Sequence, residues 1–158
     1  MTVTPVPKPG VQERILLHLR DYVDHAEKVE VPFALSQMGI ANAVSIARSN
    51  VPRAISGLRD QGYLVEKQAH VTGVSRKRKA YFLTDEGAKL ADDIWSKVGK
   101  QNVRVIGKDG RASNMELAEA LENTDLPLRH VDVIRYLDDS GTIDLSVLSA
   151  DLIERDLS

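Results

Sequence analysis

The sequence predicts a mainly α-helical protein with a small β wing, an α+β fold. Apolar residues recur at helical spacing in several segments. A short helix over residues 49–61 is followed by a hairpin rich in cations, and the hairpin ends in a strand-like run, Ala80-Tyr81-Phe82-Leu83. Only 4% of the 158 residues are aromatic, so the expected core consists of leucine, isoleucine, valine and alanine.

The composition excludes several classes of protein. Without cysteine, the chain has neither disulfides nor cysteine-ligated metal. No apolar run approaches the roughly 18 residues that a membrane span needs, and the N-terminus lacks the apolar core of a signal peptide. We therefore expect a cytoplasmic protein with no membrane partner, and we expect residues 1–10, which include three prolines, to form a flexible arm.

The net charge of −2 conceals an asymmetry along the chain. Residues 1–100 hold 15 Lys and Arg against 11 Asp and Glu, whereas residues 101–158 hold 6 against 12. Within residues 45–79 the count is 8 basic against 2 acidic. A local positive surface favours a polyanionic partner. The change of sign indicates a boundary between two domains, residues 11–99 and 100–158.

The first two helices are expected from the spacing of apolar residues. A helix is predicted from position 11 to about position 28, with one face apolar. A short second helix is predicted over residues 36–44, with Ser36 as its N-cap. Residues 45–47 then form the turn that leads to the third helix.

The third helix contains Pro52, which restricts where the helix can begin. Proline is tolerated in the first turn of a helix but not in its interior. We therefore expect the helix to start at Ser49, give or take one residue; with Ser49 as N-cap, Pro52 is third in the helix. Gln61-Gly62 is a typical stop. The apolar stripe that this helix can bury consists of Val51, Ala54, Ile55 and Leu58.

A β hairpin and a fourth helix complete the first domain. Residues 63–67 are predicted to form a strand, Gly73 lies near the tip of the following loop, and residues 79–83 form the return strand. Thr84 is expected to cap a helix over residues 85–98, whose first turn holds two acids in the favourable position.

Residues 100–158 are expected to form a small acidic segment of a hairpin and helices. A hairpin is predicted over residues 103–112 with an Asp109-Gly110 turn. Ser113-Asn114-Met115-Glu116 has the spacing of a capping box and is expected to open a helix through Leu121.

The rest of this segment is expected to be mostly helical. Asp125-Leu126-Pro127 is predicted to open another helix, residues 142–144 are briefly extended, and residues 145–157 form the last helix. We expect this acidic segment to serve dimerisation or to bind a protein partner.

The first turns of the third helix carry side chains suited to duplex DNA. Arg48 and Ser49 suit phosphate or the helix entry, Asn50 can pair bidentately with adenine, and Arg53 can do so with guanine. The small pair Ser56-Gly57 would permit a close approach. The alternative is an ordinary solvated amphipathic helix, which shows the same pattern.

Four consecutive cations, Arg76-Lys77-Arg78-Lys79, precede the return strand. Strand alternation would point two of them to each face, and burying two charges is costly. We therefore place them at the loop end of the hairpin, where both rows can reach phosphates or the minor groove. A solvated run of charge is the alternative, but the position of the run, one hairpin after a short pair of helices, favours contact with DNA.

The sequence gives little support to enzymatic chemistry. The four histidines, His18, His25, His70 and His130, have no metal-ligand spacing. Residues 107–111 lack the spacing of a phosphate-binding loop. Adjacent acids such as Asp92-Asp93 diverge by roughly 100 degrees on a helix, so they do not form an acid–base pair. We expect neither an enzyme nor a cofactor or metal.

These residues resemble a known family. Residues 46–55, continued by Gly62-Tyr63-Leu64-Val65, resemble the recognition helix and first wing strand of MarR-type winged helix-turn-helix proteins. Residues 78–87 are similar to the second wing strand and the Leu-Thr-x-x-Gly entry to the next helix. About 70 residues are covered well and residues 103–121 loosely. The span 31–98 also resembles the N-terminal winged domain of archaeal transcriptional regulators.

The resemblance implies roles for individual residues. Ser49, Asn50, Pro52 and Arg53 would take part in selective binding of a duplex. Gln37 would contact the DNA backbone from the second helix, and the wing would bind through Arg76 and Arg78. Two residues depart from the family pattern: Ala47 stands where a capping serine or threonine is usual, and Pro52 stands where a small polar residue often contacts DNA.

Three functional hypotheses follow. The first is a transcriptional regulator, acting as a homodimer, that binds double-stranded DNA selectively. The second is an adaptor that uses a winged-helix scaffold to bind an acidic protein partner. The third, binding of structured or single-stranded nucleic acid, is weaker, because the wing offers few exposed aromatic residues and Tyr81 and Phe82 are expected in the core. The candidate DNA-contacting residues are Gln37, Arg48, Ser49, Asn50, Pro52, Arg53, Ser56, Arg76, Lys77, Arg78 and Lys79.

Overall fold

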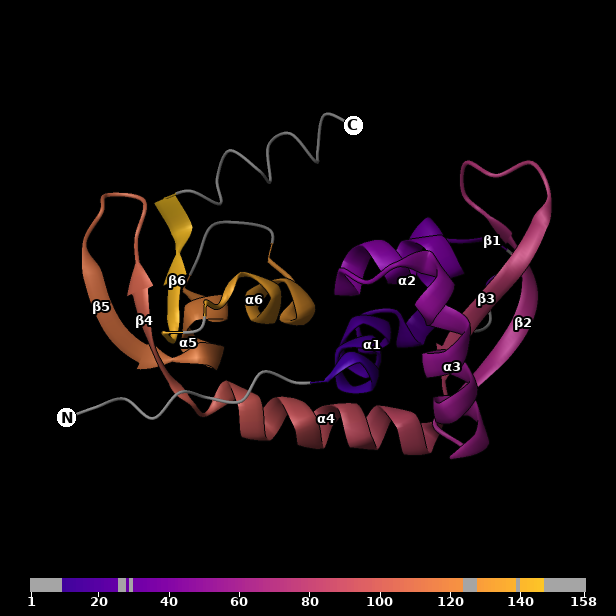
Figure 1. Cartoon of the computed structure of the whole chain (residues 1–158), viewed down its shortest axis with the longest axis horizontal. Helices are drawn as coiled ribbons and strands as arrows, with labels where there is room; N and C mark the ends of the chain where they lie inside the picture. The colour runs from indigo at the N-terminus through magenta and orange to yellow at the C-terminus, as the bar shows by residue number, and fades with distance from the viewer. Residues whose placement is uncertain (1–9, 26–27, 29, 124–127, 139, 147–158) are drawn as a thin grey trace. The chain divides into compact units, whose positions relative to one another are not determined.

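A computed structural model describes residues 10–25, 28, 30–123, 128–138 and 140–146 (Figure 1). The chain divides into two compact units. The N-terminal unit comprises Pro9–Trp95, and the C-terminal unit comprises Ser96–Ser158 together with Met1–Lys8. None of the described helices is long and apolar enough to cross a membrane.

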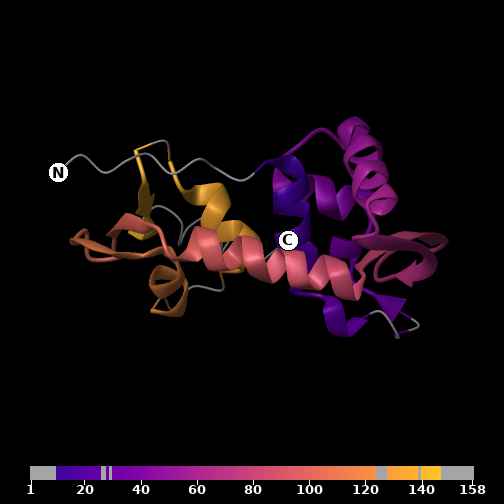
Figure 2. The same ribbon diagram turned by 90° about the horizontal axis from the view of Figure 1, so that it is seen from below.

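The N-terminal unit is a winged helix-turn-helix. Its sheet has the order β1-β2-β3, in which β1 runs parallel to β2 and β2 antiparallel to β3. Figure 2 shows the β2–β3 hairpin from below. Among the described residues, three α-helices and three 3-10 helices precede the hairpin and one α-helix follows it, which confirms the predicted fold class. The elements are α1 (Val11–Arg20), η1 (Val23–His25), β1 (Glu30–Val31), η2 (Phe33–Leu35), α2 (Gln37–Val44), η3 (Arg48–Asn50), α3 (Val51–Asp60), β2 (Leu64–Val71), β3 (Lys77–Leu83) and α4 (Asp85–Gly99).

The core of this unit forms where α1 packs against α2, α3 and β3. The first helix buries Ile15, Leu16 and Leu19. Two polar contacts tie α1 to its neighbours: Arg14 Nη1 donates to the carbonyl of Val44 at 2.7 Å, and the buried His18 donates through Nε2 to the carbonyl of Ala34 at 2.8 Å. Each of these two backbone carbonyls therefore has a hydrogen-bond partner within the protein.

The first helix is shorter than predicted. It ends at Arg20 rather than near position 28, and the N–H of Tyr22 bonds to the carbonyl of Leu19 at 3.0 Å, which closes the last turn. Val23, which lies beyond the end of this helix, is 46% exposed and is not part of the core. The two-residue strand β1 was not predicted, because two residues are too few to show alternation.

The second and third helices meet as predicted, with one correction. Ser36 caps α2 by accepting from the N–H of Gly39 at 3.1 Å, and Ser45 makes the turn in a left-handed conformation. The correction is a shift of one residue: residues 48–50 form the 3-10 turn η3, and Asn50 is the N-cap of α3, which lies within the one-residue margin of the prediction. Pro52 lies in the first turn of α3, where a missing N–H costs little.

The end of α3 and the entry to α4 are joined by Thr84. Gly62 takes a positive φ of 83°, and the N–H of Tyr63 bonds to the carbonyl of Leu58 at 3.0 Å, as in a Schellman stop. Thr84 Oγ1 accepts from the N–H of Gly87 at 3.0 Å and donates to the carbonyl of Gly62 at 2.7 Å. The predicted cap is thus confirmed. The strands β2 and β3 are longer than predicted, with Gly73 in their turn.

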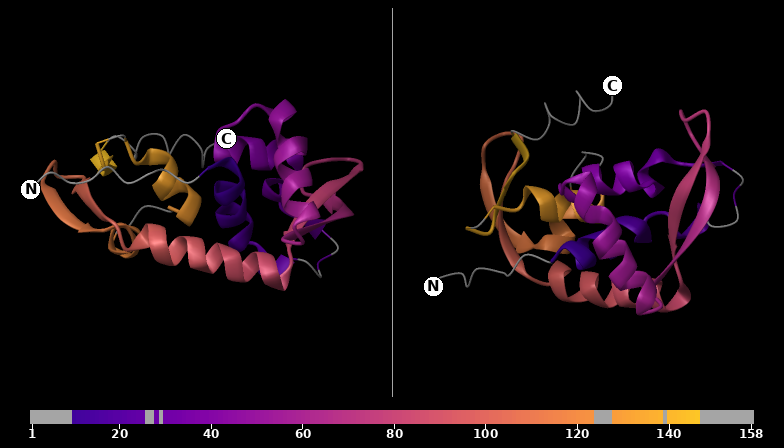
Figure 3. Two further views of the ribbon diagram at one scale, coloured as in Figure 1. Left: turned by 60° about the horizontal axis from the view of Figure 1, so that its bottom comes forward. Right: turned by 45° about the vertical axis from the view of Figure 1, so that its right-hand side comes forward.

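The C-terminal unit is a three-stranded sheet with helices. The sheet has the order β5-β4-β6, with β4 antiparallel to β5 and parallel to β6 (Figure 3). The predicted hairpin and the extended stretch at residues 142–144 are present, and Gly110 takes a φ of 82° in the turn. The elements are β4 (Asn102–Ile106), β5 (Ala112–Glu116), α5 (Leu117–Glu122), α6 (His130–Tyr136) and β6 (Thr142–Asp144).

The predicted capping box at residues 113–116 was wrong. These residues form strand β5, in which Ser113 is paired with Val105 and Met115 with Val103. Pairing with β4 fixes this backbone as a strand, and the helix begins only at Leu117. The arm at residues 1–9, the helix start at 125–127 and residues 147–157 of the predicted last helix lie outside the described residues.

We predict that Gly39→Ala strongly destabilises the N-terminal unit. A Cβ at this position would lie 2.1 Å from the carbonyl oxygen of Phe33, so η2 and α2 would have to separate. The expected loss is about 2–4 kcal/mol of unfolding free energy, measured by urea denaturation. Gly57→Ala is the matched control, because its Cβ would meet only the flexible amide of Gln12. Equal stability of both variants would contradict the close packing.

Candidate nucleic-acid interface

The residues predicted to contact DNA lie mostly exposed on η3, α3 and β3. Arg48, Ser49 and Asn50 form η3, and all three side chains are exposed. Pro52 and Arg53 are exposed in the first turn of α3. The other predicted residues are Gln37 at the start of α2 and Ser56 on α3, both half-buried, and Arg76, Lys77, Arg78 and Lys79, all exposed.

The orientation of α3 follows from its apolar stripe. As predicted, the helix buries Val51, Ala54, Ile55 and Leu58. Because Pro52 and Arg53 fall between these positions, helical geometry directs them away from the core. The surface that α3 presents to solvent therefore begins with η3 and continues along its first turn.

An open groove of about 580 Å³ brings together α2, η3 and the wing. Five predicted residues line it: Gln37, Arg48, Lys77, Arg78 and Lys79. Position 48 and the cations of β3 thus share one surface although about thirty residues separate them in sequence. The predicted residues that do not line this groove are Ser49, Asn50, Pro52, Arg53, Ser56 and Arg76.

The cations of the wing have no acid across the hairpin. The register of β2 and β3 places His70 opposite Lys77, Ala69 opposite Arg78 and Gln68 opposite Lys79. Opposite charges would normally pair at such positions. Because no acid stands opposite Lys77, Arg78 or Lys79, the positive field of these three cations is directed into solvent.

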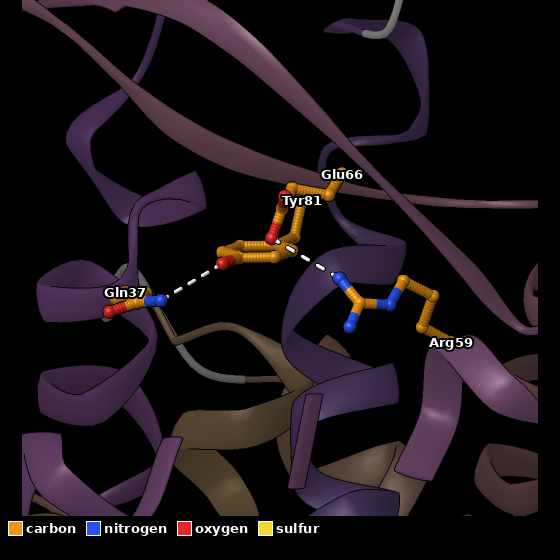
Figure 4. A network of polar contacts seen from close by, with 4 residues as sticks. All are labelled: Gln37, Arg59, Glu66 and Tyr81. Carbon is orange, nitrogen blue, oxygen red and sulfur yellow. Dashed lines mark hydrogen bonds and ion pairs between the residues drawn. The ribbon is translucent and has the colours of Figure 1, made fainter. Parts of the chain in front are cut away.

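A polar network fixes the wing to the helices (Figure 4). Tyr81 of β3 is 1% exposed, and its hydroxyl accepts a hydrogen bond from Gln37 Nε2 at 3.0 Å. Arg59 of α3 and Glu66 of β2 form an ion pair at 3.4 Å. Burial raises the pKa of Tyr81, the neighbouring Glu66 carboxylate raises it further, and Gln37 and Arg59 act in the opposite direction.

Five of the ten residues that line the groove were not among the predicted contact residues: Phe33, Ser36, Met38, Gln68 and Val74. Phe33 and Met38 are each 40% exposed, and Gln68 faces the same groove from β2. The only indication in the sequence is that Phe33 and Met38 are large apolar residues outside the spacing of a buried helix face. Exposed apolar residues are common, so this indication of a binding surface is weak. A Cβ at Gly57 would lie 2.5 Å from the side-chain amide of Gln12 in α1, and the close approach of DNA at Gly57 stays a prediction.

We predict that Tyr81 of the native protein ionises at a higher pH than an ordinary tyrosine. This ionisation step should be missing from the titration curve of Tyr81→Phe. The pKa of Tyr81 is raised above its ordinary value of 10.0 in the folded protein, so its neutral form stabilises the fold below about pH 10 and this contribution is lost as the pH rises further. Absorbance titration of the native protein measures the ionisation. Urea denaturation at pH 8 and pH 11 should show that the wild type loses its advantage over the variant at the higher pH.

A Tyr81→Phe variant with the same native titration curve as the wild type would contradict this assignment. The variant should also lose roughly 1 kcal/mol at pH 8, because the Gln37 amide then lacks its partner.

Solved structures similar to this chain include two bacterial proteins, ZitR and MepR. A zinc-responsive MarR family member, ZitR of Lactococcus lactis, matches 61% of this chain with 57% of its own, at 21% identity and a TM-score of 0.42. MepR of Staphylococcus aureus, in a complex with DNA, matches 56% of this chain with 65% of its own, at 20% identity and a TM-score of 0.43. This chain thus spans less than two thirds of either neighbour. No family model and no curated protein matches the sequence. ZitR belongs to the family that the sequence motifs resemble.

Proposed function

We propose that this chain is a transcriptional regulator that binds double-stranded DNA sequence-selectively. One observation carries the proposal: Arg48, at the entry to α3, and the β3 cations at positions 77–79 line the same groove. A duplex could therefore contact the helix and the wing at the same time, as in winged helix-turn-helix complexes in general. Residues 11–99 would be the DNA-binding domain.

In this proposal the start of α3 enters the major groove. An α-helix fits the groove width of about 12 Å, and base edges there distinguish all four base pairs. Asn50 would pair with adenine and Arg53 with guanine, while Arg48 and Ser49 would contact phosphate at the helix entry. The half-buried Ser56 would lie one turn further in. Gln37 would contact the backbone from α2.

The wing would bind phosphates beside that major groove or enter the adjacent minor groove. Arg76, Lys77, Arg78 and Lys79 are all exposed, so none has to leave the core to reach a ligand. Such contacts position the duplex and carry most of the salt-dependent affinity, whereas α3 would supply the selectivity.

Selection from a pool of random duplexes tests the function directly. The proposal expects enrichment of a defined motif at physiological salt, and Arg53→Ala should relax the preference at one base position while keeping non-specific binding. Absence of any enrichment would reject selective recognition. The adaptor alternative instead expects capture of an acidic protein partner and no preference among duplexes.

We predict that replacing Arg76, Lys77, Arg78 and Lys79 by alanine weakens duplex binding by a factor of about 100 or more near 100 mM salt. The slope of log affinity against log salt should become shallower by up to about 3–4, because each lost phosphate contact no longer releases counterions. Fluorescence anisotropy over a salt series measures both quantities.

The control variant removes the same number of positive charges as the wing variant. Alanine at Lys89, Lys97, Lys100 and Lys108 also removes four exposed cations, none of which belongs to α3 or to the β2–β3 hairpin. Equal loss of affinity in both variants would show that only overall charge matters, and would count against a role of the wing.

We further propose that the protein acts as a homodimer and that residues 100–158 provide the dimer contact or bind a protein partner. A single winged module gives modest affinity, whereas a two-fold dimer reads two half-sites about one helical turn apart. Light scattering of the full chain should give twice the mass of one chain. A monomeric mass at the concentrations that saturate DNA would exclude this assembly.

A further inference from the structure

The groove between α2 and the wing combines cations with exposed apolar side chains. Large exposed hydrophobic residues are few in the described part of the chain: Val23, Phe33, Met38 and Val65. Two of these four, Phe33 and Met38, line this one groove together with the cations of β3. A single exposed apolar residue needs no explanation, but two of them beside a cluster of cations indicate a ligand with both kinds of surface.

The charge of the groove restricts the ligand to an anion. Four of the ten lining residues are cations, Arg48, Lys77, Arg78 and Lys79, and no lining residue is acidic. A DNA strand alternates a charged phosphate with the largely apolar face of a deoxyribose. It therefore complements both the cations and the apolar residues, whereas a simple inorganic anion would leave Phe33 and Met38 without a function.

We propose that one sugar–phosphate strand of a bound duplex runs through this groove, with Phe33 and Met38 packed against its deoxyribose rings and the four cations against its phosphates. The inference rests on the proposed DNA-binding function and adds an apolar contact to it. A helix in the major groove and a wing at the neighbouring minor groove are separated by one backbone strand. That strand has to pass between η3 and β3, where the groove lies.

The segment that carries the two apolar residues is fixed before any ligand binds. Ser36 Oγ donates to the carbonyl of Phe33 at 2.6 Å and accepts from the N–H of Gly39 at 3.1 Å. Gln37, next to Met38, is bonded to the buried hydroxyl of Tyr81 at 3.0 Å. Binding therefore costs little ordering of this backbone, which favours a specific contact over incidental exposure.

The test compares Phe33→Ala/Met38→Ala with Val65→Ala as the matched control. Val65 is 39% exposed and does not line the groove. We expect the double variant to bind a 25-base-pair duplex about five- to thirty-fold more weakly, from the apolar area that is no longer covered. The loss should be equal for all sequences and should leave the salt slope unchanged, because no phosphate contact is removed. Val65→Ala should bind like the wild type.

Hydroxyl-radical footprinting locates the contact, because the radical attacks deoxyribose. The wild type should protect a few consecutive sugars on one strand between the helix and wing footprints, and the double variant should lose that protection. Wild-type affinity and footprint in the double variant, with reduced binding when the wing cations are replaced, would overturn this inference and leave the proposed function intact. No duplex binding by the wild type would reject the proposed function itself.

Two further outcomes would also overturn the inference. A double variant that loses affinity for single-stranded DNA but keeps duplex affinity would assign Phe33 to stacking on unpaired bases. Thermal denaturation separates contact from folding: since both side chains are substantially exposed, the double variant should melt within a few degrees of the wild type. A large drop in melting temperature would show that the two residues serve the fold.

Discussion

The candidate interface depends on the junction between the start of α2 and strand β3. Ser36 forms an isolated antiparallel bridge with Ala80, and the adjacent Gln37 bonds to the hydroxyl of Tyr81. Since Lys79 directly precedes this junction in the chain, the junction determines where the wing cations stand relative to α2 and η3. Tyr81 suits the position because it is buried and neutral at physiological pH. A charged group there would need a full set of compensating partners.

The wing can carry positive charges that no acid opposes, because its cations are exposed to solvent. Cations in water cost little to leave unpaired, and pairing them on the surface would stabilise the fold by a small amount only. The protein thus loses little stability by having no acid directly opposite Lys77, Arg78 or Lys79. Because fields of exposed charges decay over about 8 Å at physiological salt, only acids close to the hairpin could offset this local field.

Sequence reasoning predicted the parts of the fold that are set by local rules. The stripe of α3, the cap at Ser36, the stop at Gly62 and the entry at Thr84 all follow from spacing and backbone chemistry over a few residues. The errors came where distant contacts override local preference. Residues 113–116 had the spacing of a capping box, but pairing with β4 made them a strand. The apolar lining by Phe33 and Met38 was likewise invisible, because it arises only when η2 and α2 meet the hairpin.

The single hydroxyl of Thr84 connects the end of α3 to the start of α4. Its oxygen is donor and acceptor at once, and so serves the carbonyl that follows α3 and the N–H that opens α4. Serine keeps both capacities, whereas valine has nearly the same shape and neither of them. Valine at this position would therefore remove the side-chain partner of two backbone groups at the point where α3, the hairpin and α4 converge.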